Sequence, residues 1–445
     1  MLEENVATLG GADVPRRTSR SRAYAWMVFA VIFLLMLSDY MSRQVLNAVF
    51  PQLKLEWHLS DAQLGMLSGV VGLMVGLLAF PVALVADRWG RARSVVLMAL
   101  FWSLATVGCG LAESYGHLLT ARLLVGVGEA GYGSVGLAII LSVFPASMRA
   151  TLTGAFTSAG MFGSVLGMAA GGVMATRFGW RMAFIGMGLF GLALVLFYAV
   201  TVTEARLARH AHRSPADMAG GNSRLAGSGT GPGLAGRLFK ALFCTPTLIF
   251  TYVGSGLQLF TAYAIIAWMP SYLNRYHGLA PDKAALSAAG LLIVSAVGMS
   301  LCGILTDWLG HKSPERKATL AIIYCLGSCG LLLVGMRMPP STAQLAVIAI
   351  GVFFAAGTWG PTGAMVANLV NGSIHSTAMA TLTLANNLIG AAPGPYLTGV
   401  LADRIGLLGA LQYIPLISLA AALAYALAKA NYVRDLRRFQ EAEGW

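Results

Sequence analysis

Twelve apolar stretches, each long enough to cross a lipid bilayer as a helix, dominate this sequence of 445 residues. A transmembrane helix needs about 20 mostly apolar residues, whereas the strands of a membrane barrel alternate in units of about ten residues, a pattern absent here. Charged residues make up 11% of the chain, less than half of the share of about 25% that is usual in soluble domains. The sequence therefore predicts an all-α integral membrane protein with spans at 23–50, 61–85, 94–113, 117–143, 150–176, 182–202, 245–270, 284–308, 318–338, 343–370, 376–402 and 408–430.

Lysine and arginine are unequally divided between the two sides that these spans would separate. With a cytoplasmic N-terminus, the cytoplasmic segments hold 21 of the 30 cationic residues and the opposite side holds seven, while Arg43 and Arg122 lie within spans. Such an excess sets the orientation of membrane proteins, so we predict that both termini are cytoplasmic. The net charge of +12 is then explained by orientation rather than by nucleic-acid binding. The Ala-, Gly- and Arg-rich composition and the short loops favour a bacterial inner membrane.

A long polar interruption with a Gly/Ser-rich run divides the chain into two sets of six spans, and its composition is typical of a flexible linker. Two pairs of motifs repeat across this division. Asp87 and Asp307 follow spans 2 and 8 and lie 220 residues apart, and Arg177 and Arg404 each begin an Arg-x-Gly sequence, 227 residues apart. Internal duplication is typical of secondary transporters. We therefore predict a cytoplasmic tail at 1–22, a six-helix bundle at 23–202, a cytoplasmic linker at 203–244, a second bundle at 245–430 and a cytoplasmic tail at 431–445.

Three motifs carry a family resemblance: the Asp-Arg-x-Gly-Arg loop at 87–91, the Gly-Val-Gly-Glu-Ala-Gly-Tyr run at 126–132, and the stretch at 268–278. With them the chain resembles the major facilitator superfamily over nearly its whole length. The run in span 4 resembles spinster-like lipid transporters, and the stretch at 268–278 occurs in outline in both spinster-like proteins and organic anion:cation symporters. The resemblance implies twelve transmembrane helices in two pseudo-symmetric six-helix bundles. It also implies a central cavity lined by spans 1, 4, 7 and 10.

Four ionisable residues lie within the predicted spans: Asp39 and Arg43 in span 1, and Arg122 and Glu129 in span 4. A charge at the centre of a membrane helix costs about 2.5–3.5 kcal/mol on insertion scales, so each one needs a partner or a function. Asp39 and Arg43 are spaced i, i+4 and can pair on one helix face. The resemblance places all four residues around the central cavity, where the two acids would carry protons and the two arginines would bind an anionic substrate. The alternative is a set of buried salt bridges that hold spans 1 and 4 together.

The second half has no comparable acid in its spans and offers amides, hydroxyls and aromatic rings instead. We predict that several of these residues complete the substrate site, with Tyr263 and Asn387 as the strongest candidates. The alternative for each residue is packing between helices or anchoring at the membrane interface. The predicted set is Gln258, Tyr263, Trp268, Trp359, Asn386 and Asn387.

The loop motif after span 2 has a different predicted role. In the family that the chain resembles, this loop is a cytoplasmic latch that closes in one conformation and opens in the other. We therefore assign gating to Asp87, Arg88, Gly90 and Arg91, with Asp307 as the reduced copy in the second half. The glycine permits a tight turn, and the charges can bridge to a neighbouring helix end.

These features together predict a secondary active transporter, coupled to protons, that moves a small organic anion or an amphiphile such as a lysolipid by alternating access. One alternative is a proton-driven antiporter that exports drugs or metabolites, although Met168 stands where such antiporters have a proline. An uncoupled facilitator is another.

Two other classes of protein are disfavoured. An enzyme would need a reactive set of side chains that the sequence does not offer, and a receptor would need a signalling domain for which the tails are too short. We also expect a monomer with no cofactor and no metal. The five cysteines lack metal-ligand spacing, and no Walker-type ATP loop is present.

Overall fold

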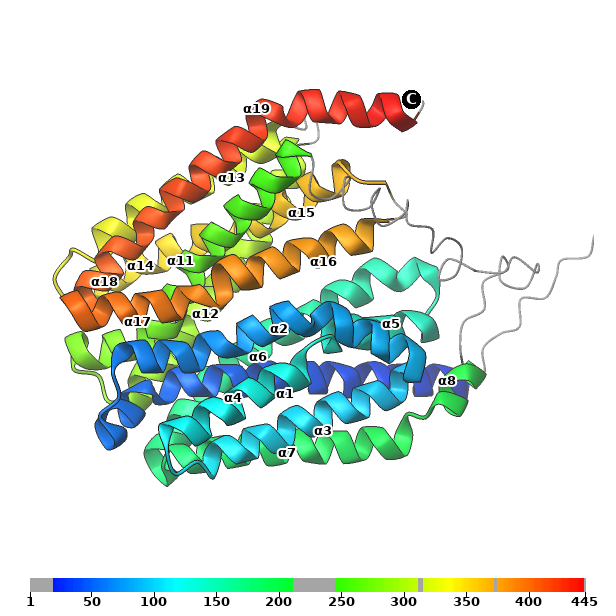
Figure 1. The fold of residues 1–445 in the computed structure, drawn as a ribbon, viewed down its shortest axis with the longest axis horizontal. Coiled ribbons are helices and arrows are strands. Elements are labelled where there is room, and N and C mark those ends of the chain that lie inside the picture. Colours follow the sequence, from blue (N-terminus) through cyan, green and yellow to red (C-terminus); the bar gives the residue numbers. More distant parts are fainter. Residues whose placement is uncertain (1–18, 211–244, 311–314, 372–373, 444–445) are drawn as a thin grey trace, which may run out of the picture.

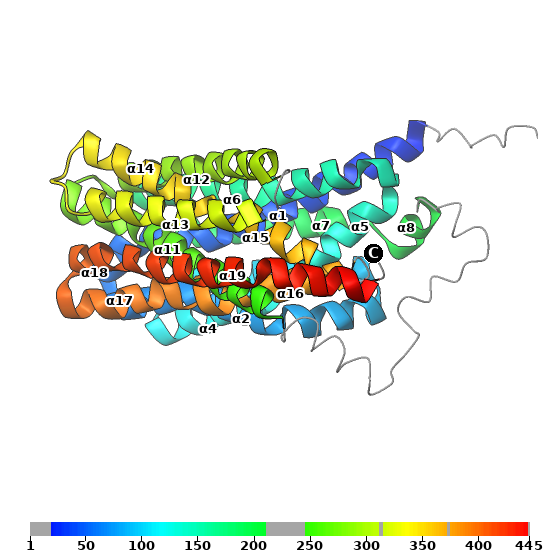
Figure 2. The same ribbon diagram turned by 90° about the horizontal axis from the view of Figure 1, so that it is seen from above.

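The structure, a computed structural model, describes residues 19–210, 245–310, 315–371 and 374–443, and every regular element within them is a helix. Eleven helical segments in these residues are long and apolar enough to cross a membrane. The remaining predicted span, span 11 at 376–402, is helical but is divided into shorter pieces. The all-α prediction is confirmed, and the long helices follow one common direction (Figure 1, Figure 2).

The N-terminal half is built from helices that pack in pairs, α1 against α6 and α3 against α7. These helices are apolar on most of their surface, as expected where one side meets lipid and the other meets neighbouring helices. In chain order the elements are α1 (Ser19–Trp57), α2 (Asp61–Trp89), α3 (Arg91–Gly110), α4 (Tyr115–Glu129), α5 (Tyr132–Val143), η1 (Ala146–Met148), α6 (Arg149–Phe178), α7 (Trp180–Thr201) and α8 (Glu204–His210).

The C-terminal half repeats these pairings, with α13 against α19 in place of α3 against α7, and α11 against η3 and α17 in place of α1 against α6. The repeated pairings agree with the internal duplication read from the sequence. In chain order the elements are α11 (Pro246–His277), α12 (Pro281–Gly310), α13 (Glu315–Gly335), α14 (Thr342–Ala356), α15 (Trp359–Asn368), α16 (His375–Ala385), η3 (Asn386–Ala391), α17 (Pro393–Ile405), α18 (Leu407–Tyr413), η4 (Ile414–Leu416) and α19 (Ile417–Glu443).

Spans 4 and 10 are both interrupted, and the interruptions repeat at the spacing of the two halves. α4 ends at Glu129 and α14 ends at Ala356, which are 227 residues apart. In span 4 the chain turns at Gly131, whose φ of +86° is left-handed backbone that favours glycine. The two interruptions therefore repeat in position but not in backbone geometry, because Gly357, which follows α14, has a right-handed φ of −65°.

Span 11 is divided by the π-helix η3. The N–H of Ala392 donates to the carbonyl oxygen of Asn387 at 2.9 Å. This acceptor lies five residues before the donor, whereas in an α-helix it lies four residues before. Pro393 follows immediately and has no N–H, so the regular hydrogen-bond pattern cannot continue through this point. Single π-turns of this kind often occur at functional sites, and this one begins with Asn386 and Asn387.

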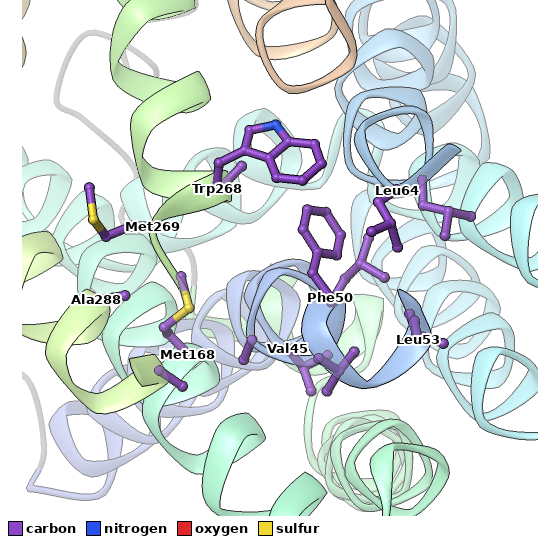
Figure 3. Close-up of a cluster of buried hydrophobic side chains, with 14 of the residues drawn as sticks. Val45, Phe50, Leu53, Leu64, Met168, Trp268, Met269 and Ala288 are labelled. Carbon is purple, nitrogen blue, oxygen red and sulfur yellow. The ribbon is translucent and has the colours of Figure 1, made fainter. Parts of the chain in front are cut away.

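The two halves share one continuous apolar core at the end where α1 stops at Trp57 and α2 begins, which we call the joined end. Figure 3 shows this core, with side chains of α1, α2 and α6 facing side chains of α11 and α12. The rings of Phe50 and Trp268 lie 5.2 Å apart across the boundary between the halves. A side chain at Gly65 of α2 would collide with the carbonyl group of Pro395, so the two backbones approach closely here.

Charged side chains also connect the halves at the joined end, in a set that we call the Asp61 network. The Asp61 carboxylate accepts two hydrogen bonds from Arg275 of α11, at 2.7 and 2.9 Å, and one from Lys54 at 2.6 Å. Asp403, near the end of α17, accepts hydrogen bonds from the backbone N–H groups of Asp61 and Ala62 and thereby caps α2. The network fixes the start of α2 to both α11 and α17.

At the opposite end, where α2 stops at Trp89, the described halves have separate cores. One core contains only residues of the N-terminal half and another contains only residues of the C-terminal half. Figure 1 shows the two groups of helices diverging toward the side where α8 and the end of α19 lie. We call this the separated end.

The first and last helices are longer than predicted. α1 runs from Ser19 to Trp57 rather than over 23–50, and α19 continues to Glu443 through most of the tail predicted at 431–445. The extension of α19 has a partner, because the buried Asp435 accepts hydrogen bonds from the backbone N–H and the hydroxyl of Thr247 in α11, at 3.1 and 2.7 Å. Most of the tail predicted at 1–22 and the linker residues 211–244 lie outside the described residues.

Candidate functional site

Arg43 lies between the two acids in the middle of the N-terminal half. Its Nε atom is 3.5 Å from Asp39 Oδ1 and 2.7 Å from Glu129 Oε2. The N–H bond is directed at Asp39, so the contact with Glu129 is a charge contact outside hydrogen-bond geometry. The acid side chains are only 3% and 0% exposed, whereas Arg43 is 22% exposed. The predicted pairing of Asp39 with Arg43 is confirmed, and Glu129 joins it from span 4.

Glu129 is held at the interruption of span 4. It is the last residue of α4, where the helix dipole disfavours a negative charge unless a cation is close. Arg43 supplies that cation. The Ser42 hydroxyl donates to the main-chain oxygen of Asp39 at 2.7 Å and lies 3.3 Å from Glu129 Oε1. The acid therefore contacts two consecutive residues of α1.

Arg122 is buried without an acid partner. Only 1% of the residue is exposed, and it forms no ion pair with a described residue. Its guanidinium donates to two main-chain oxygens, those of Ser42 at 3.0 Å and Leu67 at 3.4 Å. Carbonyl oxygens satisfy hydrogen bonds but do not neutralise a charge, so an anion would be favoured beside this side chain. We call Asp39, Arg43, Arg122 and Glu129 the charged cluster.

The two arginines of this cluster line a cavity between the halves. It encloses about 510 Å³ of space not filled by atoms, a volume that includes open solvent. α1, α2 and α4 form one wall, and α11, η3 and α17 form the other. Its polar lining residues are Arg43, Gln44, Asn47, Ser68, Arg122, Tyr263 and Asn387.

The structure brings only some of the predicted substrate residues to this cavity. Tyr263 and Asn387, the strongest candidates of the second half, line it together with both arginines. Trp268 is fully buried in the joined end, where its indole N–H donates to a main-chain oxygen at 3.0 Å. Gln258 is also fully buried, with its amide nitrogen 3.5 Å from a main-chain oxygen. Both residues lie outside the cavity lining, because they are on faces of α11 that pack against other helices.

Two further predicted residues also lie outside the cavity lining. Asn386 is buried in η3, and its side-chain oxygen has no hydrogen-bond partner among the described residues. Trp359 is 44% exposed at the start of α15. Of the two consecutive asparagines in the π-helix, Asn386 is therefore buried and Asn387 lines the cavity.

Three polar residues of the cavity lining were not predicted from the sequence: Gln44, Asn47 and Ser68. They lie in the N-terminal half, where the prediction rested on the ionisable residues of the spans. Asn47 is spaced i, i+4 from Arg43, which is the signal that places it on the same face of α1. Gln44 and Asn47 are 8% and 5% exposed, so they are nearly enclosed. Neither is charged, and only the assembled helices show that they face the cavity.

The predicted gating residues lie at the separated end, and their role stays a prediction. Gly90 connects α2 to α3 with a φ of +101°, and next to it the backbone N–H of Ala92 donates to Glu204 of α8 at 2.7 Å. The side chain of Asp87 lies outside the described part of the structure. Asp307 is exposed on α12 and forms no ion pair with a described residue.

Two helical halves related by an internal repeat, with a charged cavity between them, are the architecture of secondary transporters. Within the described residues, no group of three or more His, Cys, Asp or Glu side chains could hold a metal ion. The site is therefore a candidate solute-binding cavity between the two halves of a multi-pass membrane protein.

Comparison with known proteins identifies the family. The model of the Major Facilitator Superfamily matches residues 32–352, and the chain belongs to this superfamily. The chain is 25% identical to the "Probable L-galactonate transporter" of Escherichia coli over 96% of each chain. It is also 25% identical to "Protein spinster homolog 1" of Xenopus tropicalis, over 91% of this chain and 78% of that protein.

A solved structure has the same fold. It is a bacterial homologue of the human lysosomal transporter spinster, crystallised in an inward-facing and unoccupied conformation. The TM-score is 0.82 at 22% sequence identity, over 93% of this chain and 98% of that one. The chain is thus a transporter of small-molecule substrates rather than an enzyme, and its relatives include transporters of organic acids.

Proposed function

We propose that this transporter is a proton-coupled symporter of a small organic anion and that it works by alternating access between its two halves. The observation that carries the proposal is the charged cluster, in which one guanidinium serves two buried carboxyl groups beside an arginine without an acid partner. An antiporter that exports drugs or metabolites and an uncoupled facilitator are the alternatives.

The geometry around Arg43 supports coupling to protons. Two carboxylates that are almost fully shielded from water share one guanidinium, so each acid is paired less completely than in a one-to-one salt bridge. A proton on Glu129 neutralises this acid and frees Arg43 for another anion. A substrate carboxylate that then binds Arg43 takes the place of the Glu129 carboxylate. Proton and anion load together in this scheme, which makes the transport a symport.

The surroundings of Arg122 support an anionic substrate. Its guanidinium forms no ion pair with a described carboxylate, and it lines the cavity. An arginine offers a planar fork that binds carboxylates through two parallel hydrogen bonds. The polar side chains on both walls favour a small hydrophilic anion over a lysolipid, whose acyl chain would need a continuous apolar wall.

The distribution of basic residues supports the direction of access. Because lysine and arginine concentrate on the side of the termini, we assign the separated end to the cytoplasm and the joined end to the outside of the inner membrane. In the described conformation the cavity would then release substrate toward the cytoplasm. Separation of the joined end and closure of the other would return it to the outside.

Uptake into proteoliposomes with and without an imposed pH gradient tests the proposal. The panel contains monocarboxylates, sugar acids, aromatic acids and lysophospholipids, and Glu129→Gln is compared with the wild-type protein. We expect an inward proton gradient to drive accumulation of a carboxylate by the wild type. In Glu129→Gln, accumulation should disappear while exchange of substrate across the membrane without a gradient continues, because glutamine cannot carry the proton.

The outcomes separate the alternatives. Accumulation driven by an outward proton gradient would indicate an antiporter. Equal flux with and without a gradient would indicate a facilitator, in which the buried charges bind substrate or hold helices together. Transport restricted to lysophospholipids would replace the small anion with an amphiphile. Loss of both accumulation and exchange in Glu129→Gln would point to a structural role for this residue.

A further inference from the structure

Three uncharged polar residues form a hydrogen-bonded chain along one wall of the cavity. The Ser68 hydroxyl of α2 donates to the Asn47 side-chain oxygen at 3.0 Å, and the Asn47 amide nitrogen donates to the Gln44 side-chain oxygen at 2.8 Å. All three residues line the cavity together with both arginines. We call Gln44, Asn47 and Ser68 the amide ladder.

The ladder fixes which groups face the cavity. The Gln44 oxygen accepts from Asn47, and the NH₂ of that side chain makes no hydrogen bond to a described residue, so it is free to donate. Asn47 uses one of its two N–H bonds and retains the other. A nearly enclosed amide costs free energy when its donors find no partner. The arrangement is complete only when a ligand or water accepts from these N–H groups.

A purely structural role explains only part of the amide ladder. The hydrogen bond between Ser68 and Asn47 connects α2 to α1 and would be useful in any membrane protein. Gln44 adds nothing to that connection, because its partner Asn47 lies on the same helix. Its position, one residue after Arg43 and beside the cavity, is the feature that needs another explanation.

We infer that the amide ladder binds hydroxyl groups of the substrate, so that the transported anion is a hydroxylated carboxylate. The inference rests on the proposed function, in which the two arginines bind the carboxylate. Asn47 lies four residues beyond Arg43, about 6 Å along the helix axis. The ladder therefore lies within about one helical turn of Arg43, close enough for one small molecule to reach both. A site built to hydrogen-bond a hydroxyl group discriminates strongly against an analogue that lacks it.

The test measures binding to the full-length protein in detergent by isothermal titration. The ligands are a panel of six-carbon aldonates that differ in hydroxyl configuration, and hexanoate, which has the same length and charge without hydroxyl groups. We expect at least one aldonate to bind at least about tenfold more tightly than hexanoate. In Gln44→Met, which keeps the side-chain length, the Kd of that aldonate should rise about tenfold while the Kd of hexanoate stays within twofold.

Gln412→Met is the matched control, because this amide donates to a main-chain oxygen at the joined end and lies outside the cavity lining. It should change neither Kd. Equal affinity of the wild type for all aldonates and hexanoate would overturn the role of the ladder but leave anion binding intact. An equal loss of both ligands in Gln44→Met would show that the residue supports the fold of the cavity. Binding of neither ligand class would contradict both this inference and the proposed function.

Discussion

The two halves of this transporter place their charges in different parts of the molecule. The N-terminal half gathers four of them in the charged cluster, at the middle of its helices. The C-terminal half brings Arg275 and Asp403 to the joined end, where both bind the start of α2. Its wall of the cavity is uncharged and contributes Tyr263 and Asn387. The two bundles share an internal repeat but differ in the position of their ionisable residues.

This difference suggests that the halves have different tasks. A charge in the membrane interior is costly, so a set of four in one half is best explained by a task that needs charge, such as holding a proton and an anion. Charges at the end of a helix are cheaper and suit a contact that opens and closes. We therefore expect substitutions in the N-terminal wall to change binding and coupling. Substitutions in the Asp61 network should change the balance of conformations.

The largest effect is expected at Arg122. Arg122→Gln removes the cation that has no acid partner, and the Kd of a bound carboxylate should rise at least about 30-fold, or ~2 kcal/mol. Arg122→Lys keeps the charge and loses the planar fork, so its Kd should lie between those of Arg122→Gln and the wild type. Titration calorimetry measures both, and thermal unfolding shows whether each variant is folded. Binding to a folded Arg122→Gln with wild-type affinity would remove Arg122 from the substrate site.

The charged cluster also shows how far a sequence can predict such a site. The pairing of Asp39 with Arg43 follows from helical spacing within one span. The contact of Glu129 with the same arginine depends on how α4 packs against α1, which no local pattern gives. Likewise, Trp268 and Tyr263 lie on the same apolar helix, and the rotation of that helix decides which of them faces the cavity.

The fold was more predictable than the site for the same reason. Helix length and hydropathy are local properties, so the spans could be placed from composition. The division of span 11 by η3 has a local signal in Pro393, but its π-turn depends on the packing of α11 against it. The bond between Asp61 and Arg275 joins residues 214 positions apart and needs the assembled bundle. The π-turn and this bond both depend on contacts between helices.

A smaller effect is expected in the Asp61 network. Asp61→Asn removes the carboxylate that binds Arg275 and Lys54, so it weakens the joined end without changing the cavity. The population of molecules with this end open should rise about tenfold, or ~1.4 kcal/mol. Spin labels at His58 and Arg404, both exposed at this end, report the distance between the halves by pulsed electron resonance. The labelled protein carries substitutions of its native cysteines.

Asp282→Asn serves as the control for this measurement. Asp282 lies at the start of α12 near the same end, and it forms no ion pair with a described residue. Its substitution should leave the distance distribution unchanged. If Asp61→Asn also leaves it unchanged, the joined end is held by its apolar core and by the Asp403 cap, and the ion pairs of Asp61 have no role in gating.

The smallest effect is expected on the uncharged wall. Tyr263→Phe removes one hydroxyl group from the cavity, and a neutral hydrogen bond contributes about 0.5–1.5 kcal/mol, so the Kd of the substrate should rise about threefold. Tyr413→Phe, on an exposed residue of α18, is the control and should have no effect. The ratio of the Arg122 and Tyr263 effects measures how unequally the halves hold the substrate. If Tyr263→Phe weakens binding as much as Arg122→Gln, the two walls contribute equally. The charged cluster would then serve coupling rather than affinity.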